Sequence, residues 1–412
     1  MSKRIRRDNW SMFHKRRYLA ALLAALVILS TGGAEAGDNT LEAYCKDGLN
    51  LRSANGQHTL KLGGRIMNDW ALFDDDAGVT TAVGQQSDGS EFRRAGLYVA
   101  GTLYKQVIFK AQYDFAGDDA DFKDVYIGLK NVPGLGTVKV GHFYEPFGLE
   151  TITSSKYLTF LERALTTDTF GPERNNGIGF QAVLGNGTGT LAAGIFHDTD
   201  GFGDSSGGNL NLTARITAAP VNSGDRTVHV GAAYSRRDPN SDTTRYNAVP
   251  EAHMAEKFLD TGDITDATGV DLVGLEFAAI NGPLSVQGEW MQASVDSTTA
   301  GNPDLSSYYL FASYFLTGEH RVYRASSATF GRVRPKQNYL GDGGSGALEL
   351  ALRYSSADLT DANVSGGKLD NITLGLNWHL TPNTRVMFNY TAADLAGTGD
   401  SNIVQARFQI DF

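Results

Sequence analysis

Basic side chains recur through the first half of the chain at places where they could bind an anion. Those that residue type and spacing single out are Lys61, Arg65, Arg93, Arg94, Lys110, Lys139 and Lys156. Arginine offers two parallel N–H donors to a pair of oxygens, and lysine offers a compact, movable charge. Such a set is suited to holding phosphate or a related anion without any covalent step.

Signals for catalysis or for metal binding do not accompany these cations. The histidines are scattered, no H-E-x-x-H pair occurs, and no Cys/His spacing fits zinc. The single cysteine, Cys45, is an isolated thiol or an intermolecular link. We therefore expect no enzyme activity, no cofactor and no metal. A barrel lipase or protease with catalytic residues at its rim is the alternative from another functional class.

Strict alternation predicts the elements that position the cations. About sixteen segments of about ten residues alternate apolar and polar side chains, which is the pattern of strands with one apolar face. Residues 371–380 and 402–412 are the clearest examples, and the second ends on Phe412. A β-sandwich or propeller also alternates, but its strands are shorter than those that cross a bilayer. We predict an all-β protein, a transmembrane antiparallel β-barrel of about sixteen strands.

Composition and the N-terminal segment limit the class further. The chain has 412 residues, of which 48 are glycine, and 41% are apolar, which excludes a disordered chain. Basic residues in 3–17, an apolar run at 19–29 and the small residues of 34–36 predict a cleaved signal peptide over 1–36, with a membrane anchor as the alternative. We expect a short periplasmic segment at 37–56 and the barrel at 57–412, in the outer membrane of a Gram-negative bacterium.

Charge on the mature chain is strongly acidic. The net charge of −10 falls to −15 once the seven basic and two acidic residues of 1–36 are removed. A nucleic-acid partner is therefore disfavoured, because such partners need a basic surface. Any preference for anions must come from the local placement of cations.

Every second residue of a strand points to the same side of the sheet. The alternate positions that carry the polar residues, which we call the polar parity, are predicted to face the lumen. Ten basic and six acidic residues fall on it: Lys61, Arg65, Arg94, Lys110, Lys130, Lys139, Arg215, Arg353, Arg385 and Arg407, against Asp69, Asp114, Asp124, Glu276, Glu289 and Glu349. This excess favours an anion path, although such charges could instead pair across the lumen. Arg93 has the outward parity, so we place it beyond the hydrocarbon band or at a β-bulge.

A long connection after residue 144 is predicted to narrow the lumen. It runs for about thirty residues, and loops of that length are usually functional. Leu158, Leu161 and Leu165 have the spacing of a short amphipathic helix. We predict an inward-folded constriction loop that carries Lys156; a surface loop with a solvated lysine is the alternative. Other long loops, 74–90, 237–268, 295–305 and 317–345, are expected together at one end of the barrel.

Several motifs together resemble the phosphate-selective porin O and P family. They are residues 92–95 (Phe-Arg-Arg-Ala), 109–115, 141–157 and the segment from Phe315 to Pro335. The resemblance implies a trimeric outer-membrane anion channel with a ladder of arginines and a constriction containing lysines. It implies that Lys156 is the constriction-loop lysine, Lys110 a second central lysine, and Arg65, Arg93 and Arg94 ladder residues.

A second basic cluster is assigned more loosely to a vestibule of the same channel. Its members are Arg321, Arg324, Arg332, Arg334 and Lys336. The expected partners of the protein are phosphate or related anions, outer-membrane lipid and further copies of the chain. Polyphosphate, pyrophosphate and chloride stay open as the preferred ion, and a general non-selective porin for small hydrophilic solutes is the alternative function.

Overall fold

The computed structural model describes residues 40–117, 120–199, 203 and 209–412. The predicted signal peptide, residues 1–36, lies outside the described residues. Within the described part, no helix is long and apolar enough to cross a membrane.

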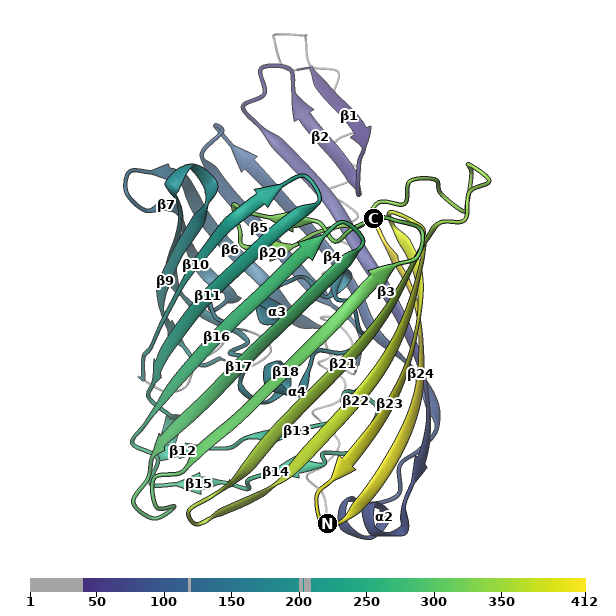
Figure 1. Cartoon of the computed structure of the whole chain (residues 1–412). Helices are drawn as coiled ribbons and strands as arrows, with labels where there is room; N and C mark the ends of the chain where they lie inside the picture. The colour runs from purple at the N-terminus through teal and green to yellow at the C-terminus, as the bar shows by residue number, and fades with distance from the viewer. Residues whose placement is uncertain (1–39, 118–119, 200–202, 204–208) are drawn as a thin grey trace, which may run out of the picture.

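Sixteen antiparallel strands form a closed wall (Figure 1). They are β3 (Thr59–Asp75), β4 (Gly89–Leu103), β5 (Val107–Asp114), β6 (Asp121–Val132), β7 (Gly136–Tyr144), β8 (Arg174–Leu184), β9 (Gly189–His197), β10 (Asn211–Ser223), β11 (Arg226–Arg237), β16 (Gly269–Asn281), β17 (Leu284–Asp296), β18 (Asp304–Phe315), β21 (Ala347–Asp361), β22 (Val364–Thr381), β23 (Thr384–Leu395) and β24 (Gly399–Asp411). β24 pairs with β3, from Ser401 opposite Asp75 to Asp411 opposite Arg65. The predicted barrel is confirmed.

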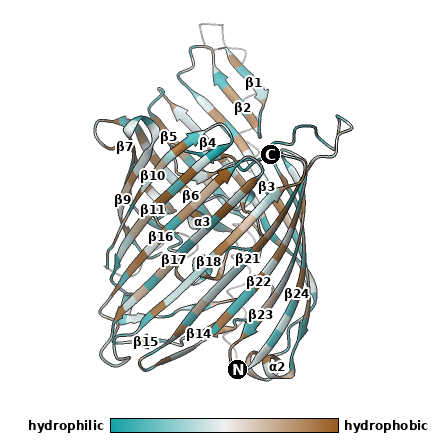
Figure 2. Cartoon of the chain, in the orientation of Figure 1, coloured by the Kyte–Doolittle hydropathy of each residue, from teal (hydrophilic) through white to brown (hydrophobic). Residues whose placement is uncertain are grey.

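Alternation along the strands separates an apolar outer face from an inner face that carries most of the polar side chains (Figure 2). Part of the inner face is apolar, and there Leu272, Met291 and Leu369 belong to a buried cluster with residues of the loops. In β22, Ile372 and Leu374 are both 52% exposed on the outside, whereas Asn371 and Thr373 are fully buried inside. Closure pairs every strand on both sides, which leaves no open sheet edge toward lipid.

The two ends of the barrel differ. Short turns, such as the one between β5 and β4 at residues 104–106, lie at one end together with the C terminus, and we call this the turn end. At the opposite end, the loop end, lie α2 (Ala77–Val83) and most of the long connections. A hairpin of β1 (Leu41–Cys45) and β2 (Leu49–Ser53) extends β3 at the turn end, where Leu49 lies opposite Leu62.

Three segments fold into the lumen. The constriction loop, residues 145–173, contains α3 (Leu149–Ile152), the 3-10 turn η2 (Ser155–Tyr157) and α4 (Leu165–Phe170). The second segment, residues 238–268, contains the turn η4 (Asn240–Asp242) and the short pairs β12 (Thr243–Thr244) with β15 (Ile264–Thr265) and β13 (Asn247–Ala248) with β14 (Leu259–Asp260). The third, residues 316–346, enters the lumen with the hairpin of β19 (Tyr323–Arg324) and β20 (Thr329–Phe330), whereas its Tyr339 packs outside the wall against Trp378 of β22. A further 3-10 turn, η3 (Gly185–Gly187), joins β8 to β9.

The third segment corrects the prediction for 317–345. It connects β18 to β21 at the turn end, not at the end of the other long loops. Its hairpin enters the barrel because it buries apolar side chains there: Phe330 packs with Leu149 of the constriction loop and with Ile280 of the wall.

Candidate functional site

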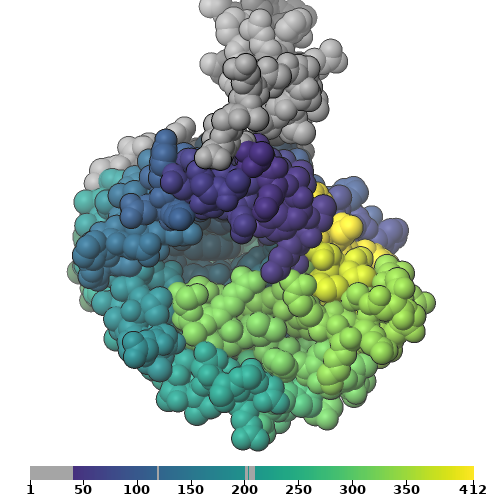
Figure 3. Space-filling model, turned by 90° about the horizontal axis from the view of Figure 1, so that it is seen from above, coloured from purple at the N-terminus to yellow at the C-terminus, as the bar shows by residue number. Residues whose placement is uncertain are grey.

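A cavity of about 620 Å³, the main cavity, runs along the inner face of β3 to β6. Asp47 of the β1–β2 turn lines it at the turn end, and Glu91 and His253 line it at the loop end. Figure 3 views the turn end and shows a hollow beside the purple and blue part of the chain. Seven of the predicted cations line the main cavity: Lys61, Arg65, Arg93, Arg94, Lys110, Lys156 and Arg324.

A β-bulge turns two consecutive arginines toward this cavity. In the pairing of β3 with β4, Met67 lies opposite Arg94 and Asn68 lies opposite Phe92, so Arg93 has no partner in the register. A bulge of this kind re-aims a side chain, and the predicted break in register at Arg93 is confirmed.

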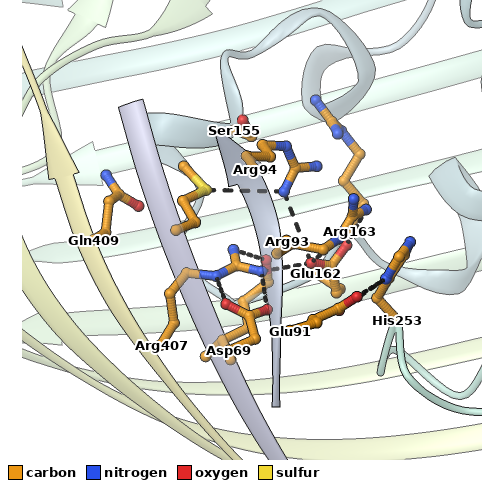
Figure 4. A network of polar contacts seen from close by, with 12 residues as sticks. Asp69, Glu91, Arg93, Arg94, Ser155, Glu162, Arg163, His253, Arg407 and Gln409 are labelled. Atoms are coloured by element: carbon orange, nitrogen blue, oxygen red, sulfur yellow. Dashed lines mark hydrogen bonds and ion pairs between the residues drawn. The ribbon is translucent and has the colours of Figure 1, made fainter. Parts of the chain in front are cut away.

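Both arginines of the bulge face one carboxylate of the constriction loop, Glu162 (Figure 4). Arg93 donates to it twice at 3.0 Å, and Arg94 lies 3.9 Å away. Burial acts to raise the pKa of Glu162, but Arg93, Arg407 and Arg94 outweigh it and hold the pKa well below the usual range. Glu162 therefore stays ionised and neutralises part of this cluster.

Lys110 belongs to an ion-pair triad that also lines the main cavity. Its Nζ lies 2.5 Å from Oδ2 of Asp124, and Nε of Arg174 lies 2.6 Å from Oδ1 of the same carboxylate. One carboxylate thus serves two cations, and the triad keeps a positive charge.

Carboxylates compensate Arg65 and Lys156 only weakly. Arg65 donates from Nη1 to Oγ of Ser155 at 2.6 Å, and among the described residues it makes no ion pair. Nζ of Lys156 lies 3.8 Å from Oδ2 of Asp411. Burial lowers the pKa of Lys156 to about 8; Asp411 opposes this, and Arg332, Arg65 and Lys110 add to it.

Tyrosine rings flank Lys156 in the main cavity. Its Nζ lies 5.8 Å from the ring centre of Tyr98 and 5.5 Å from that of Tyr157, and Nζ of Lys110 lies 5.5 Å from Tyr98. At these distances the ring faces attract the ammonium groups. They hold the two lysines near one place without neutralising them.

Side chains of the wall hold the constriction loop by its backbone. Arg385 donates to the carbonyl of Leu158 at 2.7 Å, Asn377 to that of Thr159 at 2.7 Å and Arg407 to that of Leu161 at 2.5 Å; Arg353 donates to that of Glu162 at 3.1 Å. These four carbonyls of the loop are therefore satisfied without helical hydrogen bonds.

These contacts correct the helix predicted from the leucine spacing. Leu158, Leu161 and Leu165 are buried as expected, but residues 158–164 are not helical, and the helices α3 and α4 lie on either side of them. α3 is anchored separately, since Glu289 of β17 accepts from the backbone N–H groups of Leu149 and Glu150 at 2.6 and 2.8 Å.

Other predicted residues lie elsewhere. Lys139 does not line the main cavity but a neighbouring one. Among the inward-facing arginines, Arg215 pairs with Glu276 at 2.6 Å and Arg353 with Glu251 at 2.5 Å, and both arginines are buried away from the main cavity.

The basic cluster at 321–336 is not one vestibule surface. Arg321 is buried with its guanidinium 3.6 Å from the ring centre of Phe330. Arg332 pairs with Asp411 at 2.6 Å, and Arg334 pairs with Asp47 at 2.8 Å. Nζ of Lys336 is exposed and lies 3.4 Å from the carbonyl of Thr317. Only Arg324 of this cluster lines the main cavity.

Nine acidic and basic residues that line the main cavity were missed from the sequence: Asp47, Glu91, Asp121, Lys123, Glu162, Arg163, Asp168, Glu173 and Arg174. Glu162, Arg163, Asp168 and Glu173 lie in the constriction loop, where strand parity gives no information. Arg174 is the first residue of β8, so a strand start three residues earlier than expected would have included it.

Known proteins resemble the chain over most of its length. Residues 60–412 match the phosphate-selective porin O and P family. An uncharacterised protein of Caulobacter vibrioides is 32% identical over 87% of this chain and 75% of its own length, and Porin O of Pseudomonas aeruginosa is 26% identical over 92% and 94%. Among solved structures, the anion-selective porin from Comamonas acidovorans aligns with a TM-score of 0.52 at 18% identity, over 86% of this chain and 100% of that one.

The family match and the relatives agree with the closed wall and its apolar outer face. The protein is therefore an outer-membrane porin of a Gram-negative bacterium, and the chain belongs to the phosphate-selective porin O and P family.

Proposed function

We propose that this porin is an anion-selective diffusion channel, and that phosphate or a related oxyanion passes along the main cavity. The observation that carries the proposal is the single cavity that cations of β3, β4, β5 and the constriction loop line between the two ends of the barrel. The net charge of −10 would by itself favour cations, so the preference rests on this local placement.

Passage would proceed by exchange between neighbouring cationic sites. A phosphate ion entering a narrow pore loses part of its hydration shell, and Arg65 and Lys156 replace it with N–H donors. Partial desolvation strengthens each contact because the local dielectric constant is low. Several sites of moderate strength let the ion leave again, as conduction requires.

A non-selective porin is the second candidate, and one observation favours it. Carboxylates line the same cavity as the cations, among them Asp114, Asp121, Asp124 and Glu162. If they compensate the cations fully, small solutes of either sign would pass. The sign of the zero-current potential separates the two functions.

Planar-bilayer recording of the refolded mature protein in a potassium chloride gradient tests the proposal. We expect a potential of the sign set by chloride permeation, and block of the chloride current by added phosphate. Lys156→Glu replaces a positive charge in the main cavity by a negative one. It should lower the chloride-over-potassium permeability ratio about tenfold or more, which corresponds to a free-energy difference of about 1.4 kcal/mol or more. Arg236→Gln is the control, because Arg236 lies 43% exposed near the loop end. A zero-current potential near zero for the unchanged protein would contradict the anion channel.

We further propose that the protein is a homotrimer with residues 37–56 on the periplasmic side. The family resemblance supports the trimer, and the position of β1 and β2 beside the short turns supports the periplasmic placement, because short turns face the periplasm in such barrels. Native mass spectrometry in detergent should give three copies; a monomer alone would contradict this assembly.

A further inference from the structure

Lys139 lies in a second cavity, which we call the side cavity. It has a volume of about 240 Å³ and lies between β6 to β9 of the wall and the β19–β20 hairpin, with Thr329 among its lining residues. Asp124 and Tyr144 line both this cavity and the main cavity. The side cavity is therefore a chamber beside the main cavity.

Aromatic rings surround the ammonium group of Lys139. Its Nζ lies 4.9 Å from the ring centre of Tyr126 and 5.6 Å from that of Phe143. Phe143 packs edge-on against Phe196 at 5.4 Å between ring centres. Small-molecule sites typically have this character, with aromatic walls and a few polar groups.

Lys139 carries the uncompensated charge of the side cavity. Asp124 is held by Lys110 and Arg174, and Arg215 is paired with Glu276. Among the described residues, Lys139 makes no ion pair and no hydrogen bond; it contacts the two rings, and the charge of Asp124 acts on it only at longer range. One cation against apolar rings suits a ligand with one negative charge and a flat apolar body. It suits phosphate poorly, because a compact, strongly hydrated ion gains nothing from the rings that replace its water.

We propose that the side cavity binds a small aromatic carboxylate, with the carboxylate on Nζ of Lys139 and the ring against Tyr126 and Phe143. The volume fits a single-ring ligand, since sites for drug-sized molecules start at about 300 Å³. This site does not depend on which ion the main cavity conducts.

Isothermal titration of the detergent-purified protein with benzoate, and separately with acetate, tests the site. We expect binding of benzoate and much weaker binding of acetate. Lys139→Met should weaken benzoate binding by at least about tenfold, as expected for the loss of a charge-assisted hydrogen bond, and Lys139→Arg should retain it. Tyr126→Leu should bring the benzoate affinity toward that of acetate.

A variant of the main cavity distinguishes the two sites. Lys156→Gln should leave benzoate binding within about twofold, because Lys156 does not line the side cavity. Unchanged benzoate binding in Lys139→Met, equal binding of acetate and benzoate, or loss of benzoate binding in Lys156→Gln would each overturn the proposal. Circular dichroism and the heat-dependent gel shift of the barrel confirm that each variant is folded.

Discussion

Two sides of the lumen use inward-facing arginines for different purposes. On the open side, formed by β3 to β6, Arg65 lines the main cavity and donates to a serine hydroxyl. On the filled side, formed by β16 to β24, Arg353 is fully buried and pairs with Glu251 of the segment 238–268. Both arginines have the same strand parity. The inward parity therefore determines where a charge points, and the loops determine whether an ion can reach it.

The energetic consequence of losing a charge differs between the two sides. A charge on the filled side has no water to replace a lost partner, so removing one partner leaves the other buried and uncompensated. When a charged side chain on the open side loses its partner, water or a mobile ion can take the partner's place. Substitutions on the filled side should change stability, and substitutions on the open side should change selectivity.

The largest expected effect is on the filled side. Glu251→Gln removes the nearer of two carboxylates that face Arg353 and leaves, among the described residues, only Glu150 at 3.9 Å, so it should lower the free energy of unfolding by about 3 kcal/mol. Urea titration followed by tryptophan fluorescence measures this. Glu173→Gln is the matched control, because Glu173 is exposed at the edge of the main cavity, and its cost should stay within about 0.5 kcal/mol. Equal costs for the two variants would remove the distinction between the sides.

For Lys110→Met on the open side we expect a smaller effect on stability, together with a change in ion selectivity. Asp124 keeps Arg174 at 2.6 Å, so the free energy of unfolding should fall by less than about 1 kcal/mol. The cavity loses one positive charge, and the chloride-over-potassium permeability ratio should fall about threefold. The comparison fails if this variant unfolds as readily as Glu251→Gln while its zero-current potential is unchanged.

A pH dependence should distinguish Lys156 from the arginines around it. The pKa of Lys156 is about 8, lowered mainly by burial, so its charge is present below that pH and is lost as the pH rises through it. Between about pH 7 and pH 9.5 the chloride-over-potassium permeability ratio should therefore fall about threefold. Lys156→Arg should show no such fall, since arginine stays charged. Parallel pH profiles for the two proteins would assign the change to another group.

The smallest effect is expected for a residue that belongs to neither the open side nor the filled side of the lumen. Arg334 is 52% exposed and pairs with Asp47 at the turn end. Arg334→Gln should change the free energy of unfolding by less than about 0.5 kcal/mol and leave the conductance unchanged, because exposed ion pairs contribute little. A clear loss of conductance would extend the functional path to the outer part of the turn end.

The wall was predictable because its pattern is local. In β22, the alternation of Ile372 and Leu374 with Asn371 and Thr373 is visible without any tertiary contact, and Arg93 showed as an exception to parity before the bulge explained it. The position of Lys156 in an inward-folded loop followed from the length of one connection and its buried leucines.

The filling of the lumen was not predictable because it depends on contacts between distant residues. Nothing near Arg407 in the sequence indicates that it donates to the carbonyl of Leu161, and nothing near Arg353 indicates Glu251. The same holds for the rings around Lys139. The helix expected over 158–165 failed for this reason, since wall side chains took the place of its internal hydrogen bonds.

The final strand has a role beyond closing the seam with β3. Gln405 donates to the carbonyl of Glu251, Arg407 to that of Leu161 and Gln409 to that of Lys156. One strand thus contacts two of the segments that fill the lumen. If β24 is not paired with β3, the wall stays open and both segments lose these anchors. We therefore expect closure of the barrel and positioning of the lumen segments to occur together.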